Sequence, residues 1–185
     1  MTSKYDRIGL RLALDSDDTV TPSEDEEYVD LGLPSGILWA TKNIGAMSPE
    51  DYGDYFEISN EWISDCWANR PEGLQKTYGN NWPSKKELEE LVNECTWTWT
   101  TRNSVNGYKV TGPNGKSIFL PAAGHYYYED LDTLTGVGSA CEYWSGTIGY
   151  VPMGGSFGHM YCIRGYDLSI DICFNRKPVR QVRRN

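Results

Sequence analysis

Hydrophobic residues alternate with polar ones along many short stretches of the chain, which predicts a fold built mainly from β-strands. In residues 5–14 the apolar side chains fall on one face of an extended segment: Ile8, Leu10, Leu12 and Leu14. Residues 15–27 hold seven acidic residues and no recurring apolar position, so we expect a solvated linker there. The pattern therefore predicts an N-terminal strand and acidic linker over residues 1–27 and a folded domain over residues 28–185.

The first part of that domain predicts a β-hairpin. Residues 28–40 contain a short apolar strand, turn formers at 34–36, and a second strand that ends at Trp39 and Ala40. Two strands this close in sequence are expected to pair in an antiparallel manner.

Residues 84–95 carry the strongest helix signal in the chain. Ser84 and Glu87 have the spacing of a capping box, which marks a helix start. The apolar residues that follow recur at helical spacing: Leu88, Leu91, Val92 and Cys95. A second candidate start at Ser48 is expected to give one turn at most, because Gly53 soon interrupts it.

After this helix the pattern returns to strands. Three are predicted over residues 96–124, joined by tight turns at Asn106-Gly107 and at Asn114-Gly115. Residues 125–140 are rich in turn formers and are expected to be irregular. Further strands are predicted over residues 143–146, 160–165, 167–174 and 178–183. The predicted fold class is α+β and mostly antiparallel, with one or two helices and long loops.

Composition and charge narrow the class of protein and partner. The 185 residues include seven Trp, thirteen Tyr and nineteen Gly, so the core is expected to use aromatic residues and turns more than Leu-rich helices. The formal net charge of −9 argues against nucleic acid as the main partner. No apolar run reaches the roughly 18 to 20 residues that cross a bilayer, and the first residues lack the features of a signal peptide. We therefore expect no direct membrane insertion.

The cysteines and histidines do not have the spacing of a metal site. The five cysteines are irregularly spaced without a CxxC motif, and the histidines are His125 and His159. We expect no metal and mostly buried thiols. One disulfide stays open as an alternative, with Cys162 and Cys173 as the favoured pair because they fall in neighbouring predicted strands.

Two long segments carry a resemblance to a known family: YVDLGLPSGILWATKNIGAMSPEDYGDYF (28–56) and VNGYKVTGPNGKSIFLPAAG (105–124). They resemble the Fibrobacter succinogenes major paralogous domain, which is abundant in surface proteins of gut Bacteroidetes. Shorter similar segments lie at residues 82–97, 143–147 and 178–182. The resemblance therefore extends over nearly the whole domain, from about residue 28 to about residue 183.

This resemblance implies a C-type lectin-like fold, related also to the formylglycine-generating enzyme, with a small twisted antiparallel core and termini that meet in the sheet. It implies that residues 7–14 pair near the C-terminal strand or come from an upstream domain. It also implies a place outside a bacterial cell, or alternatively on a phage particle. Two positions depart from the family pattern: Lys42 stands where many members have Cys, and Gln181 where most have Pro.

Two activities known for this fold are a poor match to the residues. Calcium-dependent sugar binding needs a Glu-Pro-Asn or Gln-Pro-Asp loop with a Trp-Asn-Asp strand, and the chain has neither. The remaining calcium candidates form an acidic loop for which simple solvation is the alternative: Glu129, Asp130 and Asp132. Oxidase chemistry needs a reactive cysteine pair, and the eleven-residue separation of Cys162 and Cys173 does not fit that motif. We therefore expect no enzyme activity.

Residues 145–176 have a composition that fits a variable binding surface. Domains of the fold that the resemblance implies are known hosts of diversity-generating retroelements, which mutate adenines. An Asn codon of the AAY type therefore mutates only to codons of the NNY type. Such codons cannot encode Glu, Gln, Lys, Met or Trp. Within this segment only Met153 and Met160 belong to that excluded set. The alternative is a fixed sequence, since strands are often poor in Lys and Glu and the last apolar residues fit core positions at period two: Leu168, Ile170, Ile172 and Phe174.

We therefore expect residues 147–176 to form the ligand-binding face of a non-enzymatic module, held by a rigid aromatic core. The expected contact residues are Tyr150, Phe157, His159, Tyr161, Arg164, Tyr166, Asp167 and Asp171. The expected core tryptophans are Trp39, Trp82, Trp97, Trp99 and Trp144. The expected partner is a protein or glycan on another cell or particle, bound without a cofactor, and the alternative is a fixed adhesin-like module of the bacterial surface.

Overall fold

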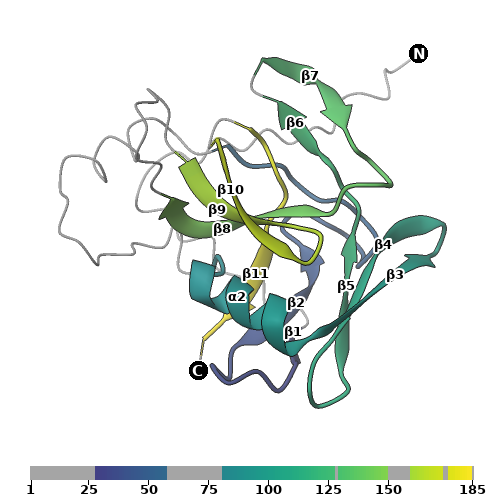
Figure 1. Cartoon of the computed structure of the whole chain (residues 1–185). Coiled ribbons are helices and arrows are strands. Elements are labelled where there is room, and N and C mark those ends of the chain that lie inside the picture. The colour runs from purple at the N-terminus through teal and green to yellow at the C-terminus, as the bar shows by residue number, and fades with distance from the viewer. Residues whose placement is uncertain (1–27, 58–80, 128, 150–158, 173–174, 185) are drawn as a thin grey trace, which may run out of the picture.

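The computed structural model of the chain describes residues 28–57, 81–127, 129–149, 159–172 and 175–184. Within these ranges the chain forms small antiparallel sheets and one short helix, which confirms the predicted α+β class with a predominance of strands (Figure 1). The elements are β1 (Tyr28–Asp30), β2 (Leu38–Asn43), α2 (Lys85–Glu94), β3 (Thr96–Arg102), β4 (Val105–Thr111), β5 (Ser117–Pro121), β6 (His125–Tyr127), β7 (Asp130–Thr135), β8 (Glu142–Gly149), β9 (His159–Arg164), β10 (Asp167–Ile172) and β11 (Arg180–Arg183). The strand predicted over residues 5–14 and the linker predicted over residues 15–27 lie outside the described residues.

The strands of the described ranges group into four sheets: β1-β2-β11, β3-β4-β5, β6-β7 and β8-β9-β10. Three of these sheets contain only strands that follow one another in the chain. Such sheets need only short connections, in agreement with the closely spaced strand signals of the sequence.

The first and last described strands belong to the same sheet. β1 pairs with β2, with Val29 opposite Trp39, so the predicted hairpin is confirmed. Its turn is closed by the N–H of Gly36, which donates to the carbonyl of Leu33 at 2.9 Å. β11 pairs with the other edge of β2, where Val182 lies opposite Trp39. The start and the end of the domain therefore meet on either side of β2.

Helix α2 begins at the predicted capping box. The Ser84 hydroxyl accepts from the N–H of Glu87 at 3.3 Å, and the Glu87 carboxylate accepts from the N–H of Ser84 at 2.6 Å. Leu88 and Leu91 are buried on the inner side of the helix. Both the start of the helix and its apolar face are therefore confirmed.

The three-strand meander β3-β4-β5 is confirmed, but one of its two predicted turns is wrong. The β3–β4 turn lies at Asn103 and Ser104, which both have positive φ, whereas Gly107 lies within β4. A Cβ at position 107 would lie 2.3 Å from the carbonyl oxygen of Leu120, so glycine is needed there for close packing between strands. The second predicted turn, at Asn114-Gly115, is confirmed.

The expectation that residues 125–140 are irregular is wrong in part. β6 and β7 form a hairpin in which His125 lies opposite Thr135 and Tyr126 opposite Leu134. Most side chains of β7 are exposed, so this strand has no continuous apolar face to mark it in the sequence.

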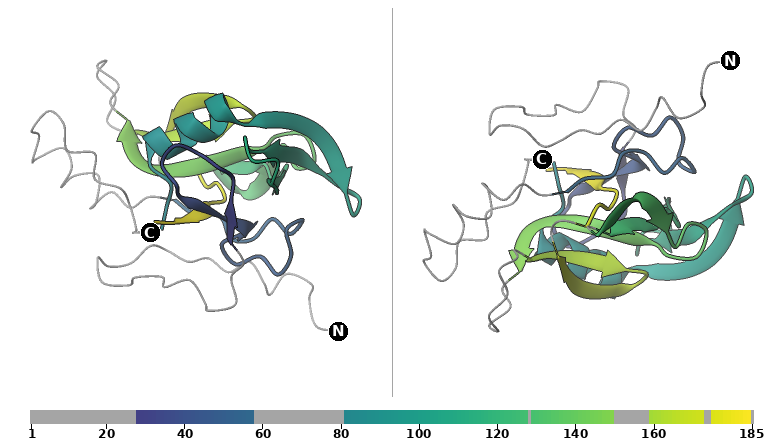
Figure 2. Two further views of the ribbon diagram at one scale, coloured as in Figure 1. Left: turned by 90° about the horizontal axis from the view of Figure 1, so that it is seen from below. Right: turned by 90° about the horizontal axis from the view of Figure 1, so that it is seen from above.

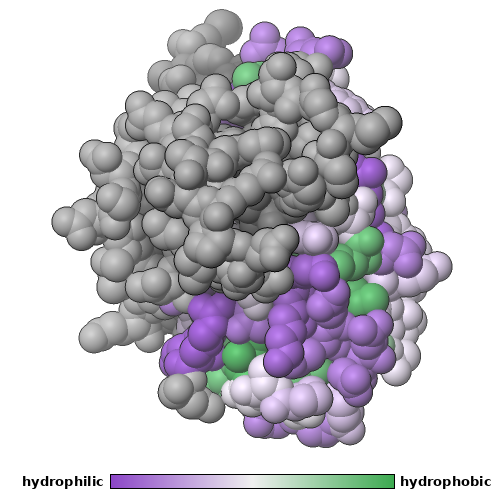
Figure 3. All heavy atoms as spheres, turned by 60° about the vertical axis from the view of Figure 1, so that its left-hand side comes forward, coloured by the Kyte–Doolittle hydropathy of each residue, from purple (hydrophilic) through white to green (hydrophobic). Residues whose placement is uncertain are grey.

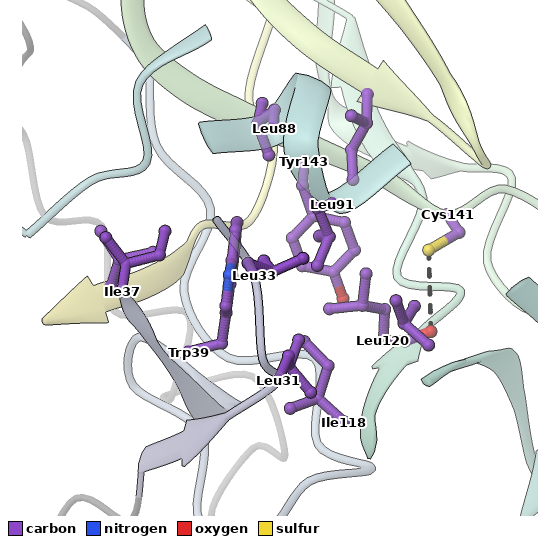
Figure 4. Close-up of a cluster of buried hydrophobic side chains, with 13 residues drawn as sticks. Leu31, Leu33, Ile37, Trp39, Leu88, Leu91, Ile118, Leu120, Cys141 and Tyr143 are labelled. Carbon is purple, nitrogen blue, oxygen red and sulfur yellow. Dashed lines mark hydrogen bonds between the residues drawn. The ribbon is translucent and has the colours of Figure 1, made fainter. Parts of the chain in front are cut away.

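The core lies where α2 meets the sheets. Figure 4 shows side chains converging on Trp39 and Tyr143 from the segment after β1, from α2 and from β5. The buried cluster consists of Leu31, Leu33, Ile37, Trp39, Leu88, Leu91, Val110, Ile118, Leu120, Cys141, Tyr143, Ile163 and Val182. Residues from both ends of the domain contribute to it, so the core connects the sheets β1-β2-β11, β3-β4-β5 and β8-β9-β10.

The tryptophans divide between this interior and the surface. Trp39, Trp82 and Trp144 are buried as expected. Trp97 is only half-buried, and the expectation is wrong for Trp99, which is 44% exposed. Figure 2 shows the β3–β4 hairpin projecting beyond the other described elements in both views, and Trp99 belongs to this hairpin.

Candidate functional site

Three of the predicted contact residues meet at the turn between β9 and β10. Arg164 ends β9, Tyr166 lies in the turn and Asp167 begins β10, and all three are exposed. Gly165 adopts a φ of 61° there, and its N–H donates to the carbonyl of Cys141 at 2.7 Å. The backbone of the turn is thereby tied to the residue just before β8.

Tyr166 belongs to a set of aromatic side chains that joins two sheets. Its ring centroid lies 6.2 Å from that of Tyr108 in β4, and the Tyr108 centroid lies 4.9 Å from that of Trp99 in β3. Both contacts are edge-to-face. Tyr166 remains 55% exposed and Trp99 44% exposed. We call Trp99, Tyr108 and Tyr166 the aromatic platform.

The strand register explains why the platform forms. In β3 the residues alternate between Thr and Trp, so Trp97 and Trp99 lie on the same face of the sheet. Trp99 is directly opposite Tyr108 on the neighbouring strand, where a cross-strand pair of aromatic rings adds stability. Trp97 also contacts Tyr108, at 5.5 Å between ring centroids, and its indole N–H donates to the carbonyl of Leu91 in α2. The platform is thus anchored to the helix.

Polar groups fix the sheet next to the platform. The Thr101 hydroxyl and the Asn106 amide oxygen are 2.7 Å apart, and the Asn106 amide nitrogen donates to the carbonyl of Gly138 at 3.0 Å. Burial raises the pKa of the Tyr108 phenol above its ordinary value, with smaller contributions from neighbours that include Asp167. The Tyr108 phenol therefore stays neutral at physiological pH.

A cluster of charged side chains lies behind Arg164. The Nζ atom of Lys177, a fully buried side chain, lies 2.5 Å from Oε2 of Glu142 and 2.8 Å from Oδ2 of Asp171. Arg164 also reaches these two carboxylates, at 2.8 Å from Asp171 and 3.7 Å from Glu142. Two cations and two carboxylates therefore balance one another, and the position of Arg164 is fixed by this charge cluster.

His125 adds a titratable group to the charge cluster. Its Nδ1 lies 3.4 Å from Oε2 of Glu142, and its ring packs edge-on against Tyr127. Burial lowers the pKa of His125, and the nearby Lys177 lowers it further, against the opposing effect of Glu142 and Asp171. The buried imidazole is therefore neutral at physiological pH.

The other predicted contact residues do not lie at the turn. Tyr161 is half-buried beside α2, with the Lys85 ammonium 4.9 Å from its ring centroid. Asp171 is mostly buried in the charge cluster, where it pairs with cations of the protein itself. Tyr150 and Phe157 lie outside the described residues, as does the side chain of His159. The structure therefore brings together Arg164, Tyr166 and Asp167 from the predicted set.

Sequence reasoning missed the contribution of β3 and β4 to this surface. Trp99 was expected in the core, and Tyr108 was not considered a contact residue. The Thr-Trp alternation does indicate that Trp97 and Trp99 share a face. The alternation does not indicate whether another element covers that face, because this depends on how the rest of the chain packs.

The remaining predictions concern a disulfide between Cys162 and Cys173 and the acidic loop at residues 129–132. Cys162 is a free, fully buried thiol whose pKa is raised by burial to about 12, so the favoured disulfide is wrong. It pairs in register with Ser169, whereas Cys173 lies outside the described residues. The carboxylate of Asp130 accepts from the N–H of Asp132 at 3.3 Å. In the described part of the chain, no three metal-binding side chains gather at one place.

The surface of the described chain has a hollow and small hydrophobic patches in addition to the platform. A hollow of about 280 Å³ on the outer face of β3-β4-β5 is lined by Thr100, Arg102 and Lys109 among others, and its Arg102 already pairs with Glu50. On the face shown in Figure 3, the described residues are mostly hydrophilic, and their hydrophobic atoms form small separate patches. No helix of the described ranges has the length and apolar character needed to cross a membrane.

Comparisons of this chain with protein-family models, with curated proteins and with solved structures found no match. Any function proposed for it therefore has to come from its own residues.

Proposed function

We propose that this protein is a non-enzymatic ligand-binding module whose binding surface is centred on Tyr166. The observation that carries the proposal is the aromatic platform, in which two half-exposed rings are held on rigid hairpins. Aromatic side chains give large contact area at low entropic cost, and they dominate the energy of many binding surfaces. Arg164 and Asp167 add a donor and an acceptor beside Tyr166, so one surface offers both stacking and polar contacts.

The proposed fold is C-type lectin-like, on the basis of the resemblance to the Fibrobacter succinogenes major paralogous domain. The sheet β1-β2-β11 supports it, because the two ends of the domain meet there as that fold requires. The same resemblance suggests a place outside a bacterial cell or on a phage particle. The buried, protonated thiol of Cys162 gives no support to oxidase chemistry, which needs an accessible thiolate.

We further propose that residues 147–176 are a variable segment of this surface, diversified by a retroelement. The turn residues Arg164, Tyr166 and Asp167 support this, because they are exposed while the neighbouring Cys162 and Ile163 are buried. Substitution of exposed residues usually changes stability by no more than about 0.5 kcal/mol. Trp99 and Tyr108 lie outside the segment and would remain constant.

The gene sequence tests the diversification. We expect a nearby reverse transcriptase and an imperfect repeat of these codons that differs only at adenines. Without such a repeat, the segment is fixed and the adhesin-like alternative is the better description.

Binding of the labelled full-length chain to intact bacterial and mammalian cells tests the binding function. We expect saturable binding that is lost in a variant with Tyr166→Ala and Asp167→Ala, which leaves Arg164 and its charge cluster unchanged. The melting temperature of this variant should stay close to that of the parent, because both side chains are exposed. Equal binding of the parent and the variant would contradict the proposed surface.

A further inference from the structure

We propose that the aromatic platform binds the sugar rings of a glycan by stacking, without calcium. This inference rests on the proposed binding function and names the chemical class of its ligand. It assigns Trp99 and Tyr166 as the stacking residues, and Arg164 and Asp167 as partners for sugar hydroxyl groups.

The chemistry of the rings favours a sugar. The face of an aromatic ring carries partial negative charge. The C–H bonds on one face of a pyranose ring carry partial positive charge, because each carbon is bonded to oxygen. Trp99 and Tyr166 meet Tyr108 at interplanar angles of 74° and 88°, so Tyr108 does not stack in parallel on either ring. Both side chains are about half exposed, which leaves ring surface for a sugar.

The polar groups beside Tyr166 complement hydroxyl groups. The side chain of Arg164 is 47% exposed although it pairs with Asp171, so part of its guanidinium remains accessible while its position is fixed. Asp167 is exposed beside it as an acceptor. A donor and an acceptor in fixed positions next to an aromatic ring suit an uncharged, hydroxyl-rich ligand better than a strongly charged one.

The surroundings of the platform favour a glycan over a protein partner. A stable protein interface buries roughly 800 Å² on each partner and has a broad, desolvated centre. Next to the platform, on the same face of β3, lies the exposed Thr101, whose hydroxyl is bonded to the Asn106 side chain. Two partly exposed rings with a hydroxyl-bearing neighbour resemble a stacking site for one or a few sugar units more than the centre of a protein interface.

Calcium is not required by this arrangement. The groups assigned to the sugar are two rings, one guanidinium and one carboxylate, which is too few oxygen ligands for a calcium ion. Binding is therefore expected to persist in the presence of EDTA.

The test measures binding of the full-length chain to a panel of neutral oligosaccharides of β-linked glucose, xylose and N-acetylglucosamine, followed by tryptophan fluorescence and calorimetry. We expect at least one of these to bind, and Trp99→Ala and Tyr166→Ala each to weaken that binding by about tenfold or more. Trp99→Phe should retain most of it. Tyr127→Ala, which removes another half-exposed aromatic side chain, is the matched control and should leave binding unchanged.

Three results would overturn the inference: no oligosaccharide of the panel binds, the two alanine variants bind as well as the parent, or EDTA abolishes binding. The cell-binding experiment separates this failure from failure of the proposed function. Binding to cells that resists periodate but is lost after protease treatment indicates a protein ligand, which contradicts the glycan and leaves the binding function intact. Absence of all binding to cells contradicts both.

Discussion

Lys177 is a full positive charge buried in the protein interior. Its ammonium is stabilised by Glu142 and Asp171 and lies over the ring of Trp144, at 5.2 Å from the centroid. Removing one partner of a buried ion pair typically costs about 3 to 5 kcal/mol, because the remaining charge is left without compensation. The residues of the charge cluster therefore depend on one another, and a further charge added to the cluster should destabilise the fold.

Protonation of His125 would add such a charge, so we expect the protein to lose stability in weak acid. The pKa of His125 is lower in the folded chain than its ordinary 6.5, hence the unfolded chain binds the proton first as the pH falls. The free energy of unfolding should have its full value above about pH 6.5 and decrease as the pH falls from there toward the folded-state pKa. Urea denaturation at several pH values measures this.

A substitution of His125 provides the control. His125→Gln should remove the loss of stability below neutral pH that the parent shows. If His125→Gln shows the same pH dependence as the parent, the effect has another source.

At the scale of elements, α2 depends on contacts at its first turn. Burial alone would raise the pKa of Glu87, but hydrogen bonds from Arg184 and from the backbone and hydroxyl of Ser84 lower it overall. The Arg184 guanidinium lies 2.6 Å from this carboxylate. The capping box therefore also connects the helix to the C-terminal end of the described chain.

We expect Ser84→Ala to destabilise the protein by about 1 kcal/mol, because an N–H of the first helical turn loses its acceptor. Urea denaturation with circular dichroism measures the change. Ser84→Asp should keep most of the stability, since Asp is also a good N-cap residue. Equal stability of the Ala variant and the parent would show that the cap contributes nothing here.

At the scale of the whole molecule, Arg180 connects two sheets. Its buried guanidinium donates to the carbonyl of Ala40 at 3.0 Å, to the side chain of Asn43 at 2.9 Å and to the carbonyl of Phe119 at 2.9 Å. The first two acceptors are in β2, whereas Phe119 belongs to β5. One side chain of β11 thereby joins β1-β2-β11 to β3-β4-β5, the sheet that carries Trp99.

Arg180→Lys should therefore be costly although it keeps the charge. An ammonium lacks the planar fork that reaches these separate acceptors, and each buried acceptor left unpaired costs about 1 to 3 kcal/mol. We expect a loss of roughly 2 to 4 kcal/mol in the free energy of unfolding, measured by urea denaturation. Arg183→Lys, at an exposed position over the ring of Tyr28, is the matched control and should change stability by no more than about 0.5 kcal/mol. Similar effects of the two substitutions would contradict this role for Arg180.

Local sequence signals predicted many of the elements. The capping box at Ser84 and Glu87, the hairpin closed at Gly36 and the turn at Asn114-Gly115 each depend on residues close together in the chain. Their geometry is set mainly by backbone preferences and short-range hydrogen bonds, which a single sequence contains. The same signals failed at Gly107, where glycine meets a packing requirement of the neighbouring strand instead of a turn requirement.

Only the tertiary structure determined which side chains reach the surface together. By itself, the sequence identified Arg164, Tyr166 and Asp167 as candidates and established the alternation that puts Trp97 and Trp99 on one face. It placed Trp99 in the core, because periodicity shows which residues share a face but not whether another element covers that face. Burial depends on contacts between strands far apart in the chain, and in the folded chain Trp99 remains 44% exposed next to Tyr108.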